Sequence, residues 1–203
     1  MTAQATRRAR RRYDRIAPVY DLLEAPAELA FGRWRRALWG RVGAERVLEV
    51  GVGTGKNLRY HPDQATVTAI DFSEGMLARA RRRADATGSR ARLALADVQA
   101  LPYDDDSFDV GLASFVFCSV PDAVVGLAEM RRVVRPGGRL LLLEHVLPAG
   151  VLAPLAQLLD PIVVRLWGAH INRDTLGNVR AAGWSDCTVA RRLGSLVVQI
   201  EAG

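Results

Sequence analysis

The stretch Glu49-Val50-Gly51-Val52-Gly53-Thr54-Gly55 decides the fold. The apolar run at residues 46–50 leads into it and has the length and composition of a buried strand. Glycine has no Cβ atom, so a glycine-rich turn after a strand lets the backbone approach a ligand closely. We therefore expect a strand, a tight turn and then a helix, with a ligand held at the turn.

An acid follows the glycine-rich turn at a distance along the chain that indicates the kind of ligand. Asp71 ends the next predicted strand, residues 66–70, and lies 20 residues beyond Gly51. A carboxylate at this place can accept hydrogen bonds from both hydroxyl groups of a ribose. The turn and the acid together predict a cofactor that contains a nucleoside.

Two other nucleotide sites fit the pattern less well. A dinucleotide site prefers G-x-G-x-x-G, but here the third glycine comes one residue early. Glu49 is unfavourable beside a pyrophosphate and suits a ligand with positive charge, such as a sulfonium or an ammonium. A P-loop fails because Lys56 is followed by Asn57 rather than Ser or Thr. An NAD-dependent oxidoreductase stays as a remote alternative.

Strand and helix patterns alternate along the rest of the chain. Further strands are expected at residues 92–96, 108–115, 139–146, 184–193 and 195–201, and helices at 73–88, 123–134 and 175–182. The segment before the first strand, residues 13–39, is predicted to be helical with breaks at Pro18 and Pro26. The alternation predicts an α/β fold: a seven-stranded, mostly parallel sheet with helices on both faces, a C-terminal antiparallel hairpin and an N-terminal helical cap.

The length of 203 residues fits one domain. Its expected parts are a helical cap or lid (1–40), a cofactor-binding core (41–147), an apolar lid or membrane-facing segment (148–173) and a closing helix with a hairpin (174–203).

Composition excludes several classes of protein. Apolar residues make up 49% and the formal net charge is +6, yet no zinc-finger, helix-turn-helix or RNA-stacking pattern is present, so we expect no nucleic-acid partner. The cysteines, Cys118 and Cys187, are too far apart for a metal knuckle and form no disulfide framework, which predicts no metal site and a reducing cytoplasm. No signal peptide and no transmembrane run of about 18 apolar residues is visible.

The third predicted strand ends in Asp97-Val98, and residues 101–103 (LPY) and 107–109 (SFD) follow it. Together with the glycine-rich turn, these residues closely resemble class I S-adenosylmethionine-dependent methyltransferases over nearly the whole chain. The resemblance implies a Rossmann-like sheet and S-adenosylmethionine as cofactor. Its implied cofactor site consists of Tyr20, Glu49, Gly51, Gly53, Gly55, Asn57, Asp71, Phe72, Met76, Asp97, Val98 and Ser114.

Finer resemblance concerns the acceptor of the methyl group. Residues 13–21 (YDRIAPVYD) resemble the entry segment of quinone-biosynthesis C-methyltransferases. Residues 117–120 (FCSV), 144–146 (EHV) and 167–173 (WGAHINR) resemble a group that includes bacterial phosphatidylethanolamine N-methyltransferases and membrane-associated thiol methyltransferases. N-methylation of phosphatidylethanolamine is the favoured expectation; S-methylation of a small thiol and C-methylation of a quinone precursor are the alternatives.

Candidate catalytic residues are Tyr20 and His145, either of which could take a proton from the nucleophile. His145 follows the fifth predicted strand at its carboxyl end, where open sheets bind ligands, and Tyr20 could close over the cofactor as part of a lid. Packing roles for both are equally open. The expected acceptor-binding residues are Tyr13, Cys118, His145, His170, Asn172 and Arg173, the last suited to a lipid phosphate.

Two segments suggest contact with a membrane. Residues 151–171 are very apolar and could form a lid or lie on a surface, and the arginines of residues 7–12 would be attracted to anionic lipid. We expect a lipophilic substrate and peripheral binding to an anionic membrane. The alternative is that the apolar stretch packs on the sheet and the arginines are solvated.

Overall fold

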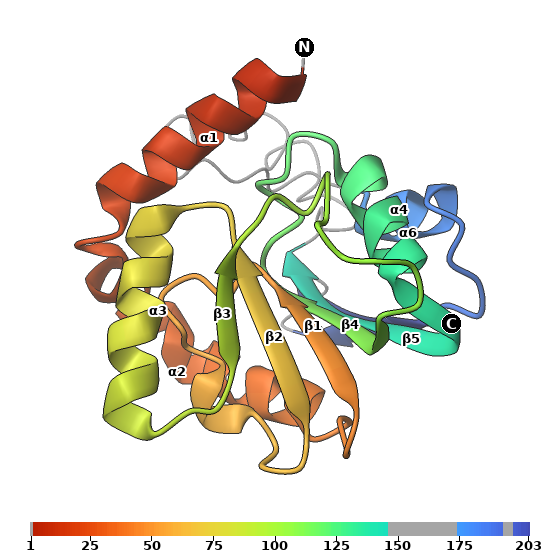
Figure 1. The fold of residues 1–203 in the computed structure, drawn as a ribbon, viewed down its shortest axis with the longest axis horizontal. Helices are drawn as coiled ribbons and strands as arrows, with labels where there is room; N and C mark the ends of the chain where they lie inside the picture. The colour runs from red at the N-terminus through yellow and green to blue at the C-terminus, as the bar shows by residue number, and fades with distance from the viewer. Residues whose placement is uncertain (1, 146–173, 193–196) are drawn as a thin grey trace.

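The computed structural model describes residues 2–145, 174–192 and 197–203. Seven strands of these residues form one sheet in the order β3-β2-β1-β4-β5-β7-β6 (Figure 1). Their bounds are β1 Arg46–Val50, β2 Thr66–Asp71, β3 Arg92–Leu95, β4 Phe108–Ser114, β5 Val134–His145, β6 Thr188–Arg192 and β7 Val197–Ala202. The first five run parallel, and β7 is antiparallel to both β5 and β6. The predicted sheet, including its C-terminal hairpin, is confirmed.

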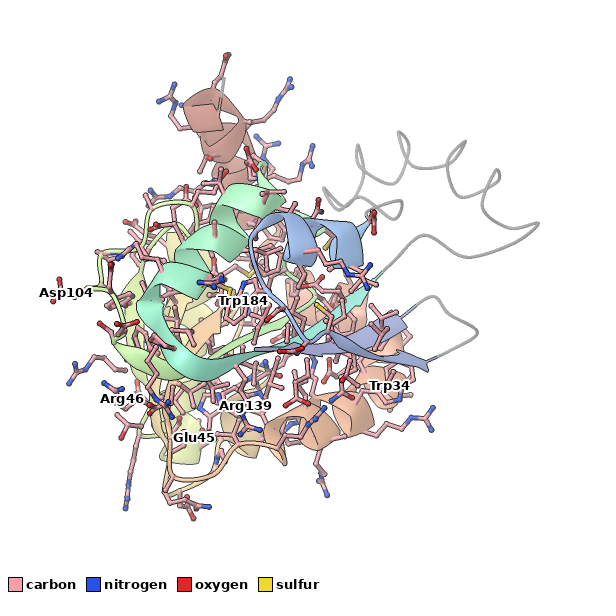
Figure 2. The ribbon with its side chains drawn as sticks, turned by 90° about the vertical axis from the view of Figure 1, so that its right-hand side faces the viewer. Trp34, Glu45, Arg46, Asp104, Arg139 and Trp184 are labelled. Carbon is pink, nitrogen blue, oxygen red and sulfur yellow. The ribbon has the colours of Figure 1, made fainter. Side chains whose placement is uncertain are left out.

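Helices cover both faces of the sheet (Figure 2). Their bounds are α1 Thr2–Ile16, α2 Tyr20–Trp39, the 3-10 turn η1 Leu58–Tyr60, α3 Glu74–Thr87, α4 Ala123–Val133 and α6 Thr175–Ala181. One face packs against α2 and α3, and Trp34 lies in that core. The other face packs against α4 and α6, with Trp184 in its core. Figure 1 shows α1 lying across the end of the sheet toward which β1, β2 and β3 point.

The leucine run of β5 supplies both cores. Leu140 and Leu142 belong to the core under α4, and Leu141 and Leu143 to the core under α2. All four side chains are fully buried. Alternate residues of a strand point to opposite faces, so a continuous apolar run is what a strand covered on both sides needs.

The break predicted at Pro26 is wrong, whereas the break at Pro18 is confirmed. The chain leaves α1 at Ile16 and enters α2 at Tyr20, but Pro26 lies inside α2. Proline removes one backbone hydrogen bond, here the one to the carbonyl of Leu22. Leu22 is on the exposed side of the helix, where water can replace that bond, and the buried inner face keeps the helix in place.

The helix expected after the glycines is also wrong, because only the three-residue η1 forms there. Successive amides bond to the carbonyl three residues back, as Leu58 does to Gly55 and Tyr60 to Asn57. Pro62 then holds His61 in an extended conformation, at φ −61° and ψ 127°, which ends any helical path.

Within the described residues, no helix combines the length and apolar character needed to cross a membrane. The segment 148–173, expected to form an apolar lid or a membrane-facing segment, lies outside the described residues.

Candidate functional site

A cavity with about 860 Å³ of empty space, part of it open to solvent, lies at the carboxyl ends of the parallel strands. The strand order reverses between β1 and β4, and open sheets bind ligands at such a point. Ten of the residues predicted from the sequence line it: Tyr13, Tyr20, Gly51, Gly53, Asp71, Phe72, Met76, Asp97, Val98 and Ser114. Four others do not: Glu49, Gly55, Asn57 and Cys118.

The glycine-rich turn forms the floor of the cavity. Gly51 and Gly53 have φ of 69° and 56°, in the left-handed region that favours glycine. A Cβ atom at Gly51 would overlap the side chain of Val116, so the turn also packs closely against the segment after β4. The turn is therefore tied to glycine by its conformation and by its packing.

Asp71 is buried at the end of β2 and faces the cavity. Its Oδ2 accepts a hydrogen bond from the amide of Gly53 and its Oδ1 one from the amide of Ser73, both at 2.9 Å. Burial raises the pKa of this carboxyl group to about 6, against the lowering effect of those amides. None of the described residues forms an ion pair with it. Such an acid suits neutral hydroxyl groups, as on a ribose.

A second acid lies at the part of the cavity where the base of a nucleoside cofactor is expected. Asp97 accepts hydrogen bonds from the backbone amide of Gln99 at 2.9 Å and from its side-chain amide at 3.1 Å. These bonds fix the carboxylate at the cavity wall. Phe72, Met76 and Val98 line the same cavity and offer apolar surface to a flat ring.

A buried polar network supports the turn from below. Glu49 is fully buried, and it accepts a hydrogen bond from Asn57 at 2.6 Å and pairs with His61 at 2.9 Å. Asn57 in turn accepts a hydrogen bond from Arg35 at 3.1 Å, and Arg35 lines the cavity. Glu49 thus connects to the cavity through two other side chains. The ring of His61 is buried, with its centroid 4.2 Å from that of the Trp39 ring.

Arg35 is a site residue that sequence reasoning missed. It is buried on the inner face of α2, with its guanidinium group 5.0 Å from the ring of Phe115 and 3.4 Å from Glu28. The signal that could have found it is an arginine placed within an otherwise apolar helical face, next to Phe31 and Trp34. A buried cation needs anionic partners, and a ligand carboxylate can be one of them.

The N-terminal segment closes over the cavity. The hydroxyl groups of Tyr13 and Ser119 are 2.5 Å apart, and Thr54 donates a hydrogen bond to Asp21 at 2.6 Å. Burial raises the pKa of Tyr13 and of Tyr20 well above the usual range for tyrosine. Both phenols therefore stay protonated near neutral pH and can donate hydrogen bonds, and a catalytic role for Tyr20 stays a prediction.

Glu144 is a second residue whose part in the site was missed. Its Oε1 accepts hydrogen bonds from the amides of Val116 and Phe117, at 2.9 and 3.1 Å. These bonds hold the segment after β4, in which Phe115 adopts a left-handed φ of 60°. Oε2 is buried and has no hydrogen-bond partner among the described residues, and burial raises the pKa of the group to about 7.

The other predicted acceptor residues cannot be placed against the cavity. His170, Asn172 and Arg173 lie outside the described residues, as does the side chain of His145. The backbone of His145 pairs with Val197 at the end of β5. Their roles stay predictions.

Comparisons with a family model, with related sequences and with solved structures all point to methyltransferases. A family model described as "Methyltransferase domain" matches residues 48–142. Demethylmenaquinone methyltransferase of Deinococcus radiodurans is 43% identical over 141 residues, which cover 66% of this chain and 58% of that protein. The enzyme of the same name from Renibacterium salmoninarum is 32% identical over 91% of this chain and 87% of that protein. Phosphatidylethanolamine N-methyltransferase of Cereibacter sphaeroides is 41% identical over 49% of this chain and 50% of that protein.

Several of these matches are partial, since the chain spans less than two thirds of the length of the first relatives it matches, among them the Deinococcus protein. A solved structure of a SAM-dependent methyltransferase from Thermotoga maritima superposes with a TM-score of 0.74 at 20% identity, covering 96% of this chain and 98% of that one, which shows the shared fold.

The cavity fits the cofactor of these proteins. Asp71, Phe72, Met76 and Arg35 all line it, and their expected roles toward the ribose, the adenine and the carboxylate of the methionine part stay predictions. By its sequence relatives and its fold, the chain belongs to the class I S-adenosylmethionine-dependent methyltransferases, in the group that includes quinone-biosynthesis C-methyltransferases and bacterial phosphatidylethanolamine N-methyltransferases.

Proposed function

We propose that this protein methylates a ring carbon of a lipophilic hydroquinone, with S-adenosylmethionine as the methyl donor. The relatives support this acceptor better than phosphatidylethanolamine, which the sequence pattern favoured. The Renibacterium relative, named for demethylmenaquinone, aligns over 87% of its length, whereas the phosphatidylethanolamine enzyme aligns over 50%.

The structural observation behind this choice is the aromatic part of the cavity lining. Tyr13 and Tyr20 come from the lid, and Phe115 comes from the segment after β4. A flat hydroquinone ring can pack on such surfaces. An ammonium head group would be better met by a carboxylate. The described carboxylates that line the cavity are Asp71, which ends β2, and Asp97, which follows β3, and both are expected to meet the cofactor.

When bound, S-adenosylmethionine supplies an electrophilic methyl group on a sulfonium. That methyl group would pass to a ring carbon of the acceptor and leave S-adenosylhomocysteine, and the proton on that carbon would be released to solvent. The chain must align the two reactants and exclude water. The Tyr13–Ser119 and Asp21–Thr54 hydrogen bonds, which close the lid onto the cavity, serve both needs.

N-methylation of phosphatidylethanolamine is the second candidate. The Cereibacter relative supports it, since its 41% identity is close to that of the Deinococcus protein over a shorter alignment. An amine acceptor would have to lose a proton before it attacks the methyl group.

The test is methyl transfer from labelled S-adenosylmethionine to three acceptors, each in the same detergent micelles. They are reduced demethylmenaquinone, phosphatidylethanolamine and a small alkyl thiol. We expect label in the quinone fraction, and a control with oxidised quinone should take up none, because the oxidised ring is not a nucleophile. Label in phospholipid or thiol alone would contradict the proposal.

A further inference from the structure

The outward face of α2 carries a stripe of exposed apolar side chains. Leu22 and Leu29 are 76% and 87% exposed, and Val19 and Leu23 are 48% and 51% exposed. Pro26 lies between them in the sequence and is also exposed. Leu22 and Leu29 are seven residues apart, so they stand on the same side of the helix, two turns from each other. Three large apolar side chains on this helix and a fourth at its N-cap, Val19, form a patch rather than scattered exposure.

Arginines continue this face toward the end of α2. Arg33 and Arg36 are exposed, and none of the described residues forms an ion pair with either. Each guanidinium group instead lies over an aromatic ring, that of Arg33 over Trp34 at 5.1 Å and that of Arg36 over Tyr60 at 5.8 Å. These two cations are held at the surface with their charge uncompensated.

A groove runs along the same edge of the helix. Leu29, Arg33 and Arg36 of α2 line one side of it. Arg59 and Tyr60 of η1 line the other. Arg59 is 58% exposed and lies 3.8 Å from Glu28, an acid of the same groove. An anionic head group could lie between these arginines while its acyl chains lie along the leucines, because guanidinium groups bind phosphate well.

We propose that the outer face of α2 docks on an anionic phospholipid bilayer. The stripe from Val19 to Leu29 enters the boundary with the acyl chains, and Arg33, Arg36 and Arg59 meet the lipid phosphates. A second copy of this chain packed on the leucines would leave Arg33 and Arg36, which have no ion pair among the described residues, without anions.

This surface differs from those that the sequence suggested, residues 7–12 and 151–171. Docking through this surface would bring the cofactor cavity close to the bilayer, because Tyr20 and Arg35, which line that cavity, lie on the inner side of the same helix. The inference rests on the proposed function in one respect: a lipophilic acceptor gives docking its use.

The test is co-sedimentation with vesicles of phosphatidylglycerol and phosphatidylcholine, compared with phosphatidylcholine alone, without cofactor or acceptor. The wild type should bind the anionic vesicles at least tenfold more strongly. Leu22→Ser/Leu29→Ser and Arg33→Glu/Arg36→Glu should each weaken that binding at least tenfold. The apolar control is Leu95→Ser/Val125→Ser, which changes exposed residues on other elements. The charge control is Arg90→Glu/Arg180→Glu, which alters net charge equally.

Methyl transfer separates this inference from the proposed function. With acceptor in detergent micelles, both α2 variants should match the wild type within twofold, and with acceptor in anionic vesicles they should be at least fivefold slower. A wild type that transfers no methyl group in micelles would contradict the proposed function and leave the sedimentation result standing.

Three outcomes would overturn the docking surface: α2 variants that bind vesicles as the wild type does, controls that lose binding equally, or a wild type that forms a dimer through these leucines and binds no vesicles. Circular dichroism melting of each variant verifies that it is folded.

Discussion

Arg35 connects the buried face of a helix with the cofactor cavity. Its guanidinium group donates to Asn57, which donates to Glu49, so a cation and a carboxylate are joined through one amide below the glycine-rich turn. The planar fork of arginine can bind Asn57 and a ligand carboxylate at once, which a lysine ammonium group does less well.

Arg35→Lys should therefore weaken binding of S-adenosylhomocysteine by about tenfold or more, since a hydrogen bond to a charged group contributes about 1.5–3 kcal/mol. Arg36→Lys, one residue further and exposed, is the matched control and should bind as the wild type does. Isothermal titration calorimetry measures both. Equal affinities would remove Arg35 from the cofactor site.

The burial of Glu144 leads to a different prediction, which concerns how the stability of the fold depends on pH. Its pKa is about 7 in the folded protein and near 4.5 when unfolded, so the folded state holds its proton to higher pH. As pH rises from 4.5 to 7 the unfolded chain loses that proton first, and the free energy of unfolding falls by about 3 kcal/mol, at about 1.36 kcal/mol per pKa unit. Glu144→Gln, which cannot ionise, should lack this fall.

Urea unfolding of both proteins at pH values from 4.5 to 7.5 tests the sign. The free energies of unfolding of the two proteins should be similar at the acid end. As pH rises, the value for the wild type should fall increasingly below that of the variant. Parallel profiles would mean that Glu144 is not the titrating group.

At the scale of elements, Asp14 fastens the lid to the start of α3. Its Oδ1 accepts hydrogen bonds from the Ser73 hydroxyl at 2.6 Å and from the amide of Gly75 at 3.0 Å. Ser73 is itself the N-cap, accepting a bond from the amide of Met76. A carboxylate beside a helix N-terminus is stabilised by the helix dipole.

Asp14→Ala should lower the free energy of unfolding by about 2 kcal/mol. It should also speed trypsin cleavage at Arg15, because the lid opens more often. The control Asp85→Ala lies on the exposed side of α3 and should change neither. A variant with unchanged stability and cleavage rate would show that the lid is held by other contacts.

The elements that the sequence predicted best are those whose pattern follows their burial. The leucine run of β5 and the helix from Ser73 to Gly88 fall in this class, the latter with Ser73 as N-cap and Gly88 in the left-handed conformation at its end. The segments around Pro26 and η1 were mispredicted because their structure depends on residues outside the local pattern. Pro26 is tolerated because the buried inner face holds α2 in place. After the glycines, Pro62 stops the helix that the glycines alone would permit.

At the scale of the whole molecule, contacts between distant residues limited the prediction. The residues of the glycine-rich turn and Asp71 follow from spacing along neighbouring strands, so ten of the residues that line the cavity could be named. Tyr13 and Ser119 are separated by 106 positions, and Arg35 and Asn57 by 22, and no local pattern encodes such pairs. The acceptor was hardest to predict because the motifs belong to the cofactor half, which enzymes with different acceptors share.

The most direct test of the account is calorimetric titration of the protein with S-adenosylhomocysteine. We predict one binding site for each chain, and at least tenfold weaker binding by Asp71→Asn, because the charged hydrogen bonds to the ribose contribute about 1.5–3 kcal/mol each. Asp63→Asn, in an exposed loop, should bind as the wild type does. No heat and no thermal shift with folded wild-type protein, or equal affinity of Asp71→Asn, would contradict the assignment of this cavity to the cofactor.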